Sequence, residues 1–207
     1  MADNKGCFVV FEGLDASGKG TMLARTAEWL FNSHAVDKIL LTREPTNSSH
    51  GKQIRKLLQK DEEPMTKAKQ LLNLYLEDRK EHLQKVIKPA LQLNTFVLCD
   101  RYKHSTICYQ QAQGIPLEKI IALHERMLVP DLTLILDVSA ETALERIGKN
   151  RAKYEKFEKK FFLEELRQNY LALKKQLPGE NIKVINAELP EDEVFSQVKR
   201  AVSGVLK

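Results

Sequence analysis

A glycine-rich segment near the start of the chain has the residue types and spacing that bind phosphate groups. Gly13, Gly18 and Lys19 fit the pattern GxxxxGK, which follows an apolar run at Cys7–Glu12 and opens a stretch with helical periodicity. Glycines let backbone N–H groups turn toward phosphate oxygens, the lysine adds a positive charge, and a helix N-terminus adds its dipole. The segment is therefore predicted to bind the phosphates of a nucleoside triphosphate.

The predicted phosphate loop is continuous in sequence, and it departs from the usual motif at one position. Gly20 stands where a Ser or Thr usually follows the lysine, and the hydroxyl comes one residue later at Thr21. We expect Thr21 and Asp100 to approach Mg²⁺, although Gly20 leaves open which hydroxyl does so. The residues assigned to the triphosphate here are Gly13, Leu14, Asp15, Ala16, Ser17, Gly18, Lys19, Gly20 and Thr21.

The elements that must position this loop alternate between strand-like and helix-like stretches. Near-continuous apolar runs separated by helical periodicity indicate a parallel sheet buried on both faces. The sequence thus predicts an α/β fold: a doubly wound five-stranded parallel sheet with helices on both faces. Strands are expected at Cys7–Glu12, Lys38–Thr42, Thr95–Cys99, Leu132–Val138 and Ile182–Ile185, and helices at about 19–33, 50–60, 66–92, 103–112, 117–128, 140–148, 159–176 and 190–205.

Three segments follow the first three strands and should meet at one site. In open α/β sheets, ligands bind outside the carboxyl ends of the strands. Here those ends carry Gly13–Thr21, Arg43-Glu44-Pro45 and Asp100-Arg101-Tyr102. Asp100 is expected to order Mg²⁺ through water or to orient Arg101.

These segments give the chain a resemblance to the thymidylate kinases. The loop Gly-Leu-Asp-Ala-Ser-Gly-Lys, Thr42-Arg43-Glu44-Pro45 and Asp100-Arg101-Tyr102 carry it, and further matching positions extend it over nearly the whole chain. The resemblance implies a P-loop NTPase fold and one nucleoside monophosphate kinase domain over 1–207. It also implies transfer of the γ-phosphoryl group of ATP to dTMP, with Mg²⁺, in a homodimer that serves dTTP synthesis.

The resemblance also assigns roles to the residues on the acceptor side. Lys19, Asp15, Asp100 and Arg101 are expected at the reacting phosphates, and Arg43, Arg79 and Arg101 have planar forks suited to an acceptor phosphate. Tyr75 and Arg79 lie one helical turn apart and therefore share a face; the family uses such a pair to stack on thymine and read a base oxygen. Ser105 and Tyr109 are expected to complete the base pocket.

The basic stretch at about 148–160 corresponds to a lid that closes over ATP in family members. Ala16 takes a loop position that is Arg in one family subgroup, and the other subgroup supplies that cation from the lid, so Arg151 is expected to act here. Arg146 and Asn186 are expected to flank the adenine.

Composition limits the possible function without identifying it. The chain has 207 residues, a net charge of +5 and three cysteines with no CxxC spacing. One domain without a disulfide framework or zinc site is expected, with Cys7 and Cys99 as buried thiols. No apolar run near the start is long enough for a signal peptide or membrane span, so a cytoplasmic enzyme without a membrane or nucleic-acid partner is expected.

Two alternatives remain at this point. One is a kinase for another nucleoside monophosphate or a deoxynucleoside, because Gly-Lys-Gly-Thr also resembles adenylate-kinase loops. The other is a nucleotide-binding regulatory protein, which would fit the basic charge but predicts missing acceptor residues. A regulatory GTPase is excluded, because the sequence has no Asn-Lys-x-Asp guanine-reading motif after a later strand.

Overall fold

The computed structural model describes residues 6–59, 64–148 and 153–206. Strands and helices alternate along these residues, as the sequence predicts. The strands are β1 (Phe8–Gly13), β2 (Ile39–Arg43), β3 (Phe96–Asp100), β4 (Leu132–Asp137) and β5 (Ile182–Asn186). The helices are α1 (Lys19–Asn32), α2 (Ser49–Leu58), α3 (Pro64–His82), α4 (Lys88–Gln92), α5 (Lys103–Ala112), α6 (Leu117–His124), α7 (Ala140–Ile147), α8 (Lys153–Gln176) and α9 (Glu191–Ser203).

The five strands form one parallel sheet in the order β2-β3-β1-β4-β5, which confirms the predicted fold class. β1 lies at the centre and pairs with β3 on one side and β4 on the other. All six residues of β1 are buried, since helices cover both faces of the sheet at this strand. The phosphate loop therefore leaves the middle of the carboxyl edge, between the loops that follow β3 and β4.

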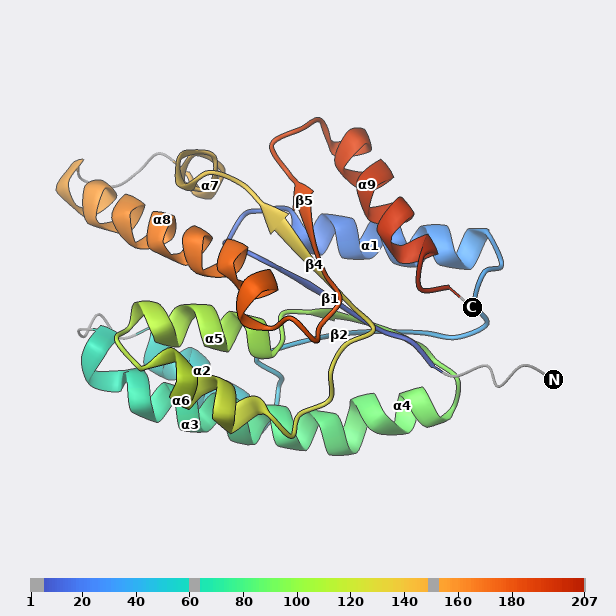
Figure 1. The fold of residues 1–207 in the computed structure, drawn as a ribbon, viewed down its shortest axis with the longest axis horizontal. Helices are drawn as coiled ribbons and strands as arrows, with labels where there is room; N and C mark the ends of the chain where they lie inside the picture. The colour runs from blue at the N-terminus through green and yellow to red at the C-terminus, as the bar shows by residue number, and fades with distance from the viewer. Residues whose placement is uncertain (1–5, 60–63, 149–152, 207) are drawn as a thin grey trace.

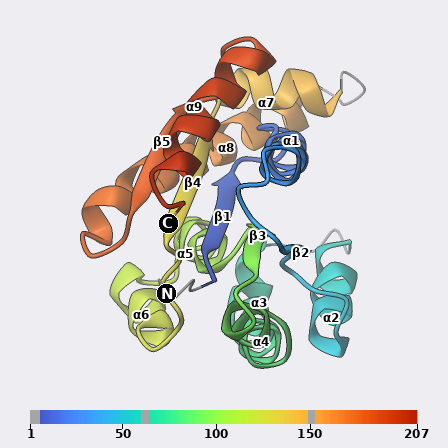
Figure 2. The ribbon, with the colours of Figure 1, turned by 90° about the vertical axis from the view of Figure 1, so that its right-hand side faces the viewer.

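Helices cover the two faces of the sheet in separate groups. Figure 1 shows α1 and α9 along one face and α3, α4 and α5 along the other, and the turned view in Figure 2 agrees. α1 packs against α9, while α5 packs against α3, α6 and α8. The sheet face that α3 and α5 cover is thus the one next to the loops that carry the expected acceptor residues.

Three expectations from the sequence are wrong in detail. The helix expected over 66–92 is interrupted by a π-helical turn at Leu83–Ile87, which ends two residues before Pro89. Pro89 has no N–H for the regular helical ladder. α8 begins at Lys153 rather than near residue 159, and the Lys- and Glu-rich segment at its start has favourable helix propensity. Cys7 is half-buried, whereas Cys99 is buried as expected.

The part of the chain that the structure describes contains no helix long and apolar enough to span a membrane.

Candidate active site

The phosphate loop turns through backbone conformations that favour glycine. Gly13 has φ +135°, and a Cβ at this position would lie 2.5 Å from the carbonyl oxygen of Leu136 on β4. Gly18 has φ 92° and caps the N-terminus of α1. Ala16 also adopts a positive φ of 62°, which is uncommon for a residue with a side chain. The loop therefore holds a strained, fixed shape at the start of α1.

Lys19 lies inside this loop rather than in solvent. Its Nζ donates to the carbonyl oxygens of Gly13 at 3.2 Å and Leu14 at 2.7 Å, and the residue is 7% exposed. Burial lowers the pKa of Lys19 to about 8, and the nearby positive charge of Arg101 adds to this effect. An anion bound in the loop would favour the charged form of this lysine.

Arg101 connects the phosphate loop to the helices of the acceptor side. Its Nη2 donates to Asp15 Oδ1 at 2.6 Å, and its Nη1 donates to Ser105 Oγ at 2.8 Å and to Tyr170 Oη at 3.0 Å. The guanidinium also lies 5.7 Å from the ring centre of Tyr109. The backbone of Arg101 has φ 68°, so the fold maintains an uncommon conformation at this residue.

The buried carboxylate of Glu12, on β1, fixes several of the groups around Arg101. Glu12 is fully buried and accepts from the backbone N–H groups of Tyr102 at 2.8 Å and Ser105 at 3.1 Å. Its other oxygen accepts from Ser105 Oγ at 2.6 Å and from Tyr170 Oη at 3.3 Å. Glu12 thus fixes the start of α5 and two of the groups that hold Arg101.

A second buried network fixes Arg79. This residue is 1% exposed, and its Nε donates to Glu44 Oε2 at 2.7 Å. Its Nη2 donates to Thr106 Oγ1 at 2.9 Å, and its Nη1 lies 2.8 Å from His124 Nε2. Glu44 also lies 3.0 Å from His82 Nδ1, so one carboxylate joins two side chains of α3 to the loop after β2.

These groups surround a cavity of about 170 Å³ between α3 and α5. Six of the expected acceptor residues line it, and Tyr75 and Tyr109 contribute aromatic surface. The cavity is lined by Asp15, Glu44, Pro45, Leu58, Tyr75, Arg79, Arg101, Tyr102, Ser105, Thr106 and Tyr109.

Arg43 does not line this cavity. It ends β2, is exposed, and lines a neighbouring groove together with His82 and Lys85. The structure thus brings Arg79 and Arg101 together as expected but leaves Arg43 outside them. Its role at the acceptor phosphate stays a prediction.

The expected adenine residues lie on the other side of the phosphate loop. Arg146 donates to the carbonyl oxygens of Ala16 at 3.3 Å and Ala187 at 3.2 Å, so it bridges the loop and the segment after β5. Asn186 is exposed, and its side-chain oxygen accepts from the backbone of Glu188 at 3.1 Å. Arg151 and most of the expected lid side chains lie outside the described residues.

Two buried oxygen atoms next to the loop have no hydrogen-bond partner among the described residues. They are Asp100 Oδ1 at the end of β3 and Ser17 Oγ in the loop. Oxygen ligands, bound water and substrate phosphates are what Mg²⁺ prefers in kinase sites. The oxygens at Asp100 and Ser17 therefore fit a Mg²⁺–phosphate complex, whereas Thr21 is exposed on the first turn of α1.

Sequence reasoning missed several polar residues of the site. Glu12, Thr106 and His124 were not expected to act, although all three contact expected site residues through hydrogen bonds. A carboxylate within an otherwise apolar strand is the available signal for Glu12. Glu44 stands in the matched Thr-Arg-Glu-Pro segment, but nothing in the sequence shows that it pairs with Arg79 thirty-five positions away.

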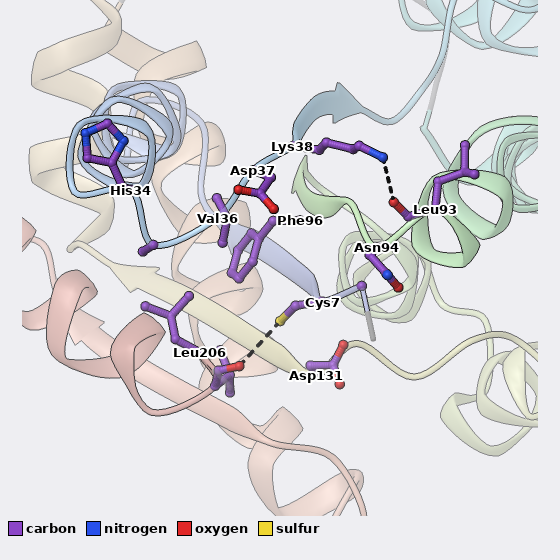
Figure 3. A pocket seen from close by; sticks show the side chains of 13 residues that line it. Cys7, His34, Val36, Asp37, Lys38, Leu93, Asn94, Phe96, Asp131 and Leu206 are labelled. Atoms are coloured by element: carbon purple, nitrogen blue, oxygen red, sulfur yellow. Dashed lines mark hydrogen bonds between the residues drawn. The ribbon is translucent and has the colours of Figure 1, made fainter. Parts of the chain in front are cut away.

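A further hollow of about 360 Å³ lies at the amino edge of the sheet, away from the expected site residues. Figure 3 shows Cys7, Phe96 and Asp131 around it, with Lys38 donating to the carbonyl oxygen of Leu93. No predicted site residue that the structure describes lines this hollow. The candidate site is therefore the carboxyl edge.

Comparison with known proteins gives a consistent result. A family model described as "Thymidylate kinase" matches residues 11–198. A relative named "Probable thymidylate kinase" from Thermococcus kodakarensis is 35% identical over 206 residues, which cover 96% of this chain and 98% of the relative. Proteins named "Thymidylate kinase" from Clostridium novyi and Brachyspira hyodysenteriae are 35% and 40% identical, covering 95% and 78% of this chain and 98% and 78% of those proteins.

Proposed function

The chain belongs to the thymidylate kinase family and is an ATP-dependent kinase of dTMP, and we propose that its acceptor binds in the cavity between α3 and α5. The observation that carries this proposal is the position of Arg101. Its guanidinium touches Asp15 of the phosphate loop and Ser105 of the cavity wall at the same time. A phosphate group in the cavity would therefore lie beside the triphosphate loop.

The cavity walls suit a pyrimidine nucleotide. Tyr75 lies on α3 and Tyr109 on α5, and both line the cavity. Among the described residues Tyr75 has no ring partner, so its face is available to stack on a base. The Arg79 fork lies at the same cavity and donates hydrogen bonds only, which suits a carbonyl oxygen of the base rather than an amino group.

Phosphoryl transfer in this site depends on position and charge rather than on a covalent nucleophile. We assign Lys19 and the loop N–H groups to the triphosphate, and Arg101 to the acceptor phosphate and the transferred group. Asp15 orients Arg101 before substrate binds. Arg43 has no partner among the described residues, and its exposed side chain would reach the acceptor phosphate only by moving from its neighbouring groove.

We propose that Mg²⁺ accompanies ATP and is held near Asp100, with Ser17 or Thr21 supplying the hydroxyl. The unpartnered buried oxygens of Asp100 and Ser17 support this proposal. When bound, the metal supplies positive charge to the triphosphate oxygens. Lys19 and Arg101 supply the remaining positive charge from the protein itself.

Three further assignments rest on the resemblance. We propose that residues at about 148–160 form a lid in which Arg151 supplies the cation that Ala16 does not, and that Arg146 and Asn186 flank the adenine. The contacts of Arg146 with the carbonyls of Ala16 and Ala187 support the adenine position. We also propose a homodimer and, from the sequence itself, a cytoplasmic location.

Steady-state ADP release with ATP and Mg²⁺ tests this function against a panel of dTMP, dUMP, dCMP, dGMP and AMP. We expect the highest kcat/KM with dTMP, and a preference for a purine nucleotide would overturn the assignment of the cavity. Arg43→Ala is expected to lose activity by orders of magnitude while ATP binding persists. Unchanged turnover in this variant would remove Arg43 from the acceptor site.

A further inference from the structure

His124 lies at the end of α6, against the side of Arg79 that is away from Glu44. The residue is 2% exposed. Its Nε2 lies 2.8 Å from Arg79 Nη1, and its Nδ1 lies 2.7 Å from the carbonyl oxygen of Ile120 on the same helix. Both ring nitrogens are thus within hydrogen-bond distance of a buried partner.

The chemistry of the two partners fixes the position of the ring proton. An arginine guanidinium only donates hydrogen bonds and stays protonated in proteins, so Arg79 Nη1 requires an acceptor at His124 Nε2. A backbone carbonyl only accepts, so the Ile120 oxygen requires a donor at Nδ1. The arrangement is satisfied by one form of the ring, which is neutral and carries its proton on Nδ1.

The remaining contacts of Arg79 make this bond important for its orientation. Glu44 holds Nε and Thr106 holds Nη2, and the guanidinium carbon lies 5.2 Å from the ring centre of Tyr102. His124 is the described partner of Nη1. Of the five guanidinium N–H groups, three are thus engaged by described residues, which leaves one on each terminal nitrogen for a ligand.

We propose that His124, in its neutral Nδ1–H form, is a positioning residue that holds Arg79 in the orientation that reads the base of the acceptor nucleotide. This inference rests on the proposed acceptor cavity. His124 itself does not line that cavity, and it acts through Arg79. Without His124 Nε2 as acceptor, Arg79 Nη1 would have no partner among the described residues. The guanidinium plane would then be held through two of its nitrogens instead of three.

The surroundings of His124 keep the ring neutral. Burial lowers its pKa to about 3, and the positive charge of Arg79 on α3 is the next cause. Lys103 and His104 on α5 lower the pKa further, while the Ile120 carbonyl opposes these effects. Glu44 is the carboxylate that pairs with Arg79 in this network. His124 therefore remains an acceptor for Arg79 across the neutral and mildly acidic range.

Two variants of His124 separate positioning from simple loss of fold. His124→Leu removes the acceptor, and we expect the KM for dTMP to rise about tenfold, the effect of one lost hydrogen bond to a charged group, while the KM for ATP stays unchanged. His124→Gln supplies a side-chain oxygen as acceptor and should restore most of the dTMP affinity. A lower kcat with both KM values unchanged, or a Gln variant no better than Leu, would overturn the proposal.

The ring nitrogens of His124 give a second readout in the intact enzyme. ¹⁵N NMR of the imidazoles should show one histidine with its proton on Nδ1 and an unprotonated Nε2 that does not titrate between pH 8 and 5, and this signal should vanish in His124→Gln. Titration near the ordinary histidine pKa, or a proton on Nε2, would overturn the inference.

Arg79→Lys distinguishes failure of this inference from failure of the acceptor site. An unchanged KM for dTMP in Arg79→Lys would remove Arg79 from the acceptor site and overturn the proposal through its premise. A raised KM in Arg79→Lys together with wild-type behaviour of His124→Leu would overturn the role of His124 alone.

Discussion

The Nη2 atom of Arg101 lies 2.6 Å from Oδ1 of Asp15, so the loop after β3 is joined to the phosphate loop after β1. The two side chains differ in exposure, with Arg101 16% and Asp15 66% exposed. Arg101 is held on its inner side by Ser105 and Tyr170 and meets a more accessible carboxylate at its outer side. An acceptor phosphate can therefore compete for Arg101 by replacing Asp15 alone.

Arg101→Lys is expected to lower kcat for dTMP phosphorylation by about 10²-fold or more, because a lysine keeps the charge but loses the planar fork. Rapid-quench measurement of a single turnover would report the chemical step directly. Asp15→Asn serves as the matched control, since it weakens the pairing but retains Arg101, and its loss should be smaller. Equal losses in the two variants would contradict a separate role for the guanidinium.

Lys19 should make ATP binding to the free enzyme weaken as the pH rises. Its pKa in the fold is about 8, below the ordinary 10.5, so the lysine changes from mostly charged at pH 7 to mostly neutral at pH 9. We expect a drop in ATP affinity of about tenfold over this range, measured by calorimetry. The arginine in Lys19→Arg does not titrate in this range, so ATP affinity in the variant should not depend on pH. The same pH dependence in the variant and the wild type would assign the effect to a group other than Lys19.

The same shift has a defined sign for stability. Between pH 8 and 10.5 the unfolded chain binds more protons at Lys19 than the folded chain does, so this residue makes the free energy of unfolding rise with pH in that window. The charged lysine is therefore a cost to the ligand-free fold that bound phosphate would offset.

Gly13→Ala is expected to destabilise the fold by roughly 1–3 kcal/mol. The new Cβ would lie 2.5 Å from the Leu136 carbonyl, in a backbone conformation with φ +135°. Gly20→Ala is the matched control, because Gly20 lies in the first turn of α1 and a Cβ there meets no atom within 4 Å. Urea unfolding of both variants checks this prediction. Equal midpoints for the two variants would contradict it, because the backbone at Gly13 would then move to accept the Cβ without loss of stability.

Acid should destabilise the protein through His124 before most carboxylates titrate. The folded pKa of about 3 lies below the ordinary 6.5, so the unfolded chain binds the extra proton between these values and stability is lost as the pH falls below 6.5. The expected loss at this residue is about 2 kcal/mol by pH 5. The free energy of unfolding should fall between pH 7 and pH 5 by about 2 kcal/mol less in His124→Gln than in the wild type. An equal fall in both proteins would contradict the lowered pKa of His124.

Much of the fold was predictable because its signals are local. Apolar runs with β-branched residues marked all five strands, and the GxxxxGK spacing located the loop at Gly13–Lys19. The π-helical turn at Leu83–Ile87 is not predicted by the sequence, whose helical pattern continues through Pro89. α8 begins at Lys153, earlier than predicted, because a run of charged residues is typical of a solvated loop as well as of a helix.

The site was predictable only for residues at the strand ends and on matched segments. Tyr75, Arg79 and Arg101 lie together around one cavity, in agreement with their expected neighbourhood. The partners that hold them come from distant parts of the chain, as with Glu12 and Tyr170, or Arg79 and His124. No periodicity connects such pairs, because their contacts depend on how helices pack over the sheet.

Tyr75→Leu is expected to raise the KM for dTMP by roughly tenfold or more through loss of base stacking, with little change in the KM for ATP. Leucine keeps an apolar side chain at this half-buried position of α3, so the fold should persist. Thermal unfolding of the variant gives the control. A similar rise in both KM values would indicate general damage instead of a lost base contact.

A crystal structure of the enzyme with dTMP alone would show directly whether the acceptor binds in the cavity between α3 and α5. We expect the thymine ring against Tyr75 in this cavity, a base carbonyl within hydrogen-bond distance of Arg79, and the phosphate on Arg101 in place of Asp15. Nucleotide density in the hollow at the amino edge of the sheet, or in the groove beside Arg43 with the cavity empty, would contradict it.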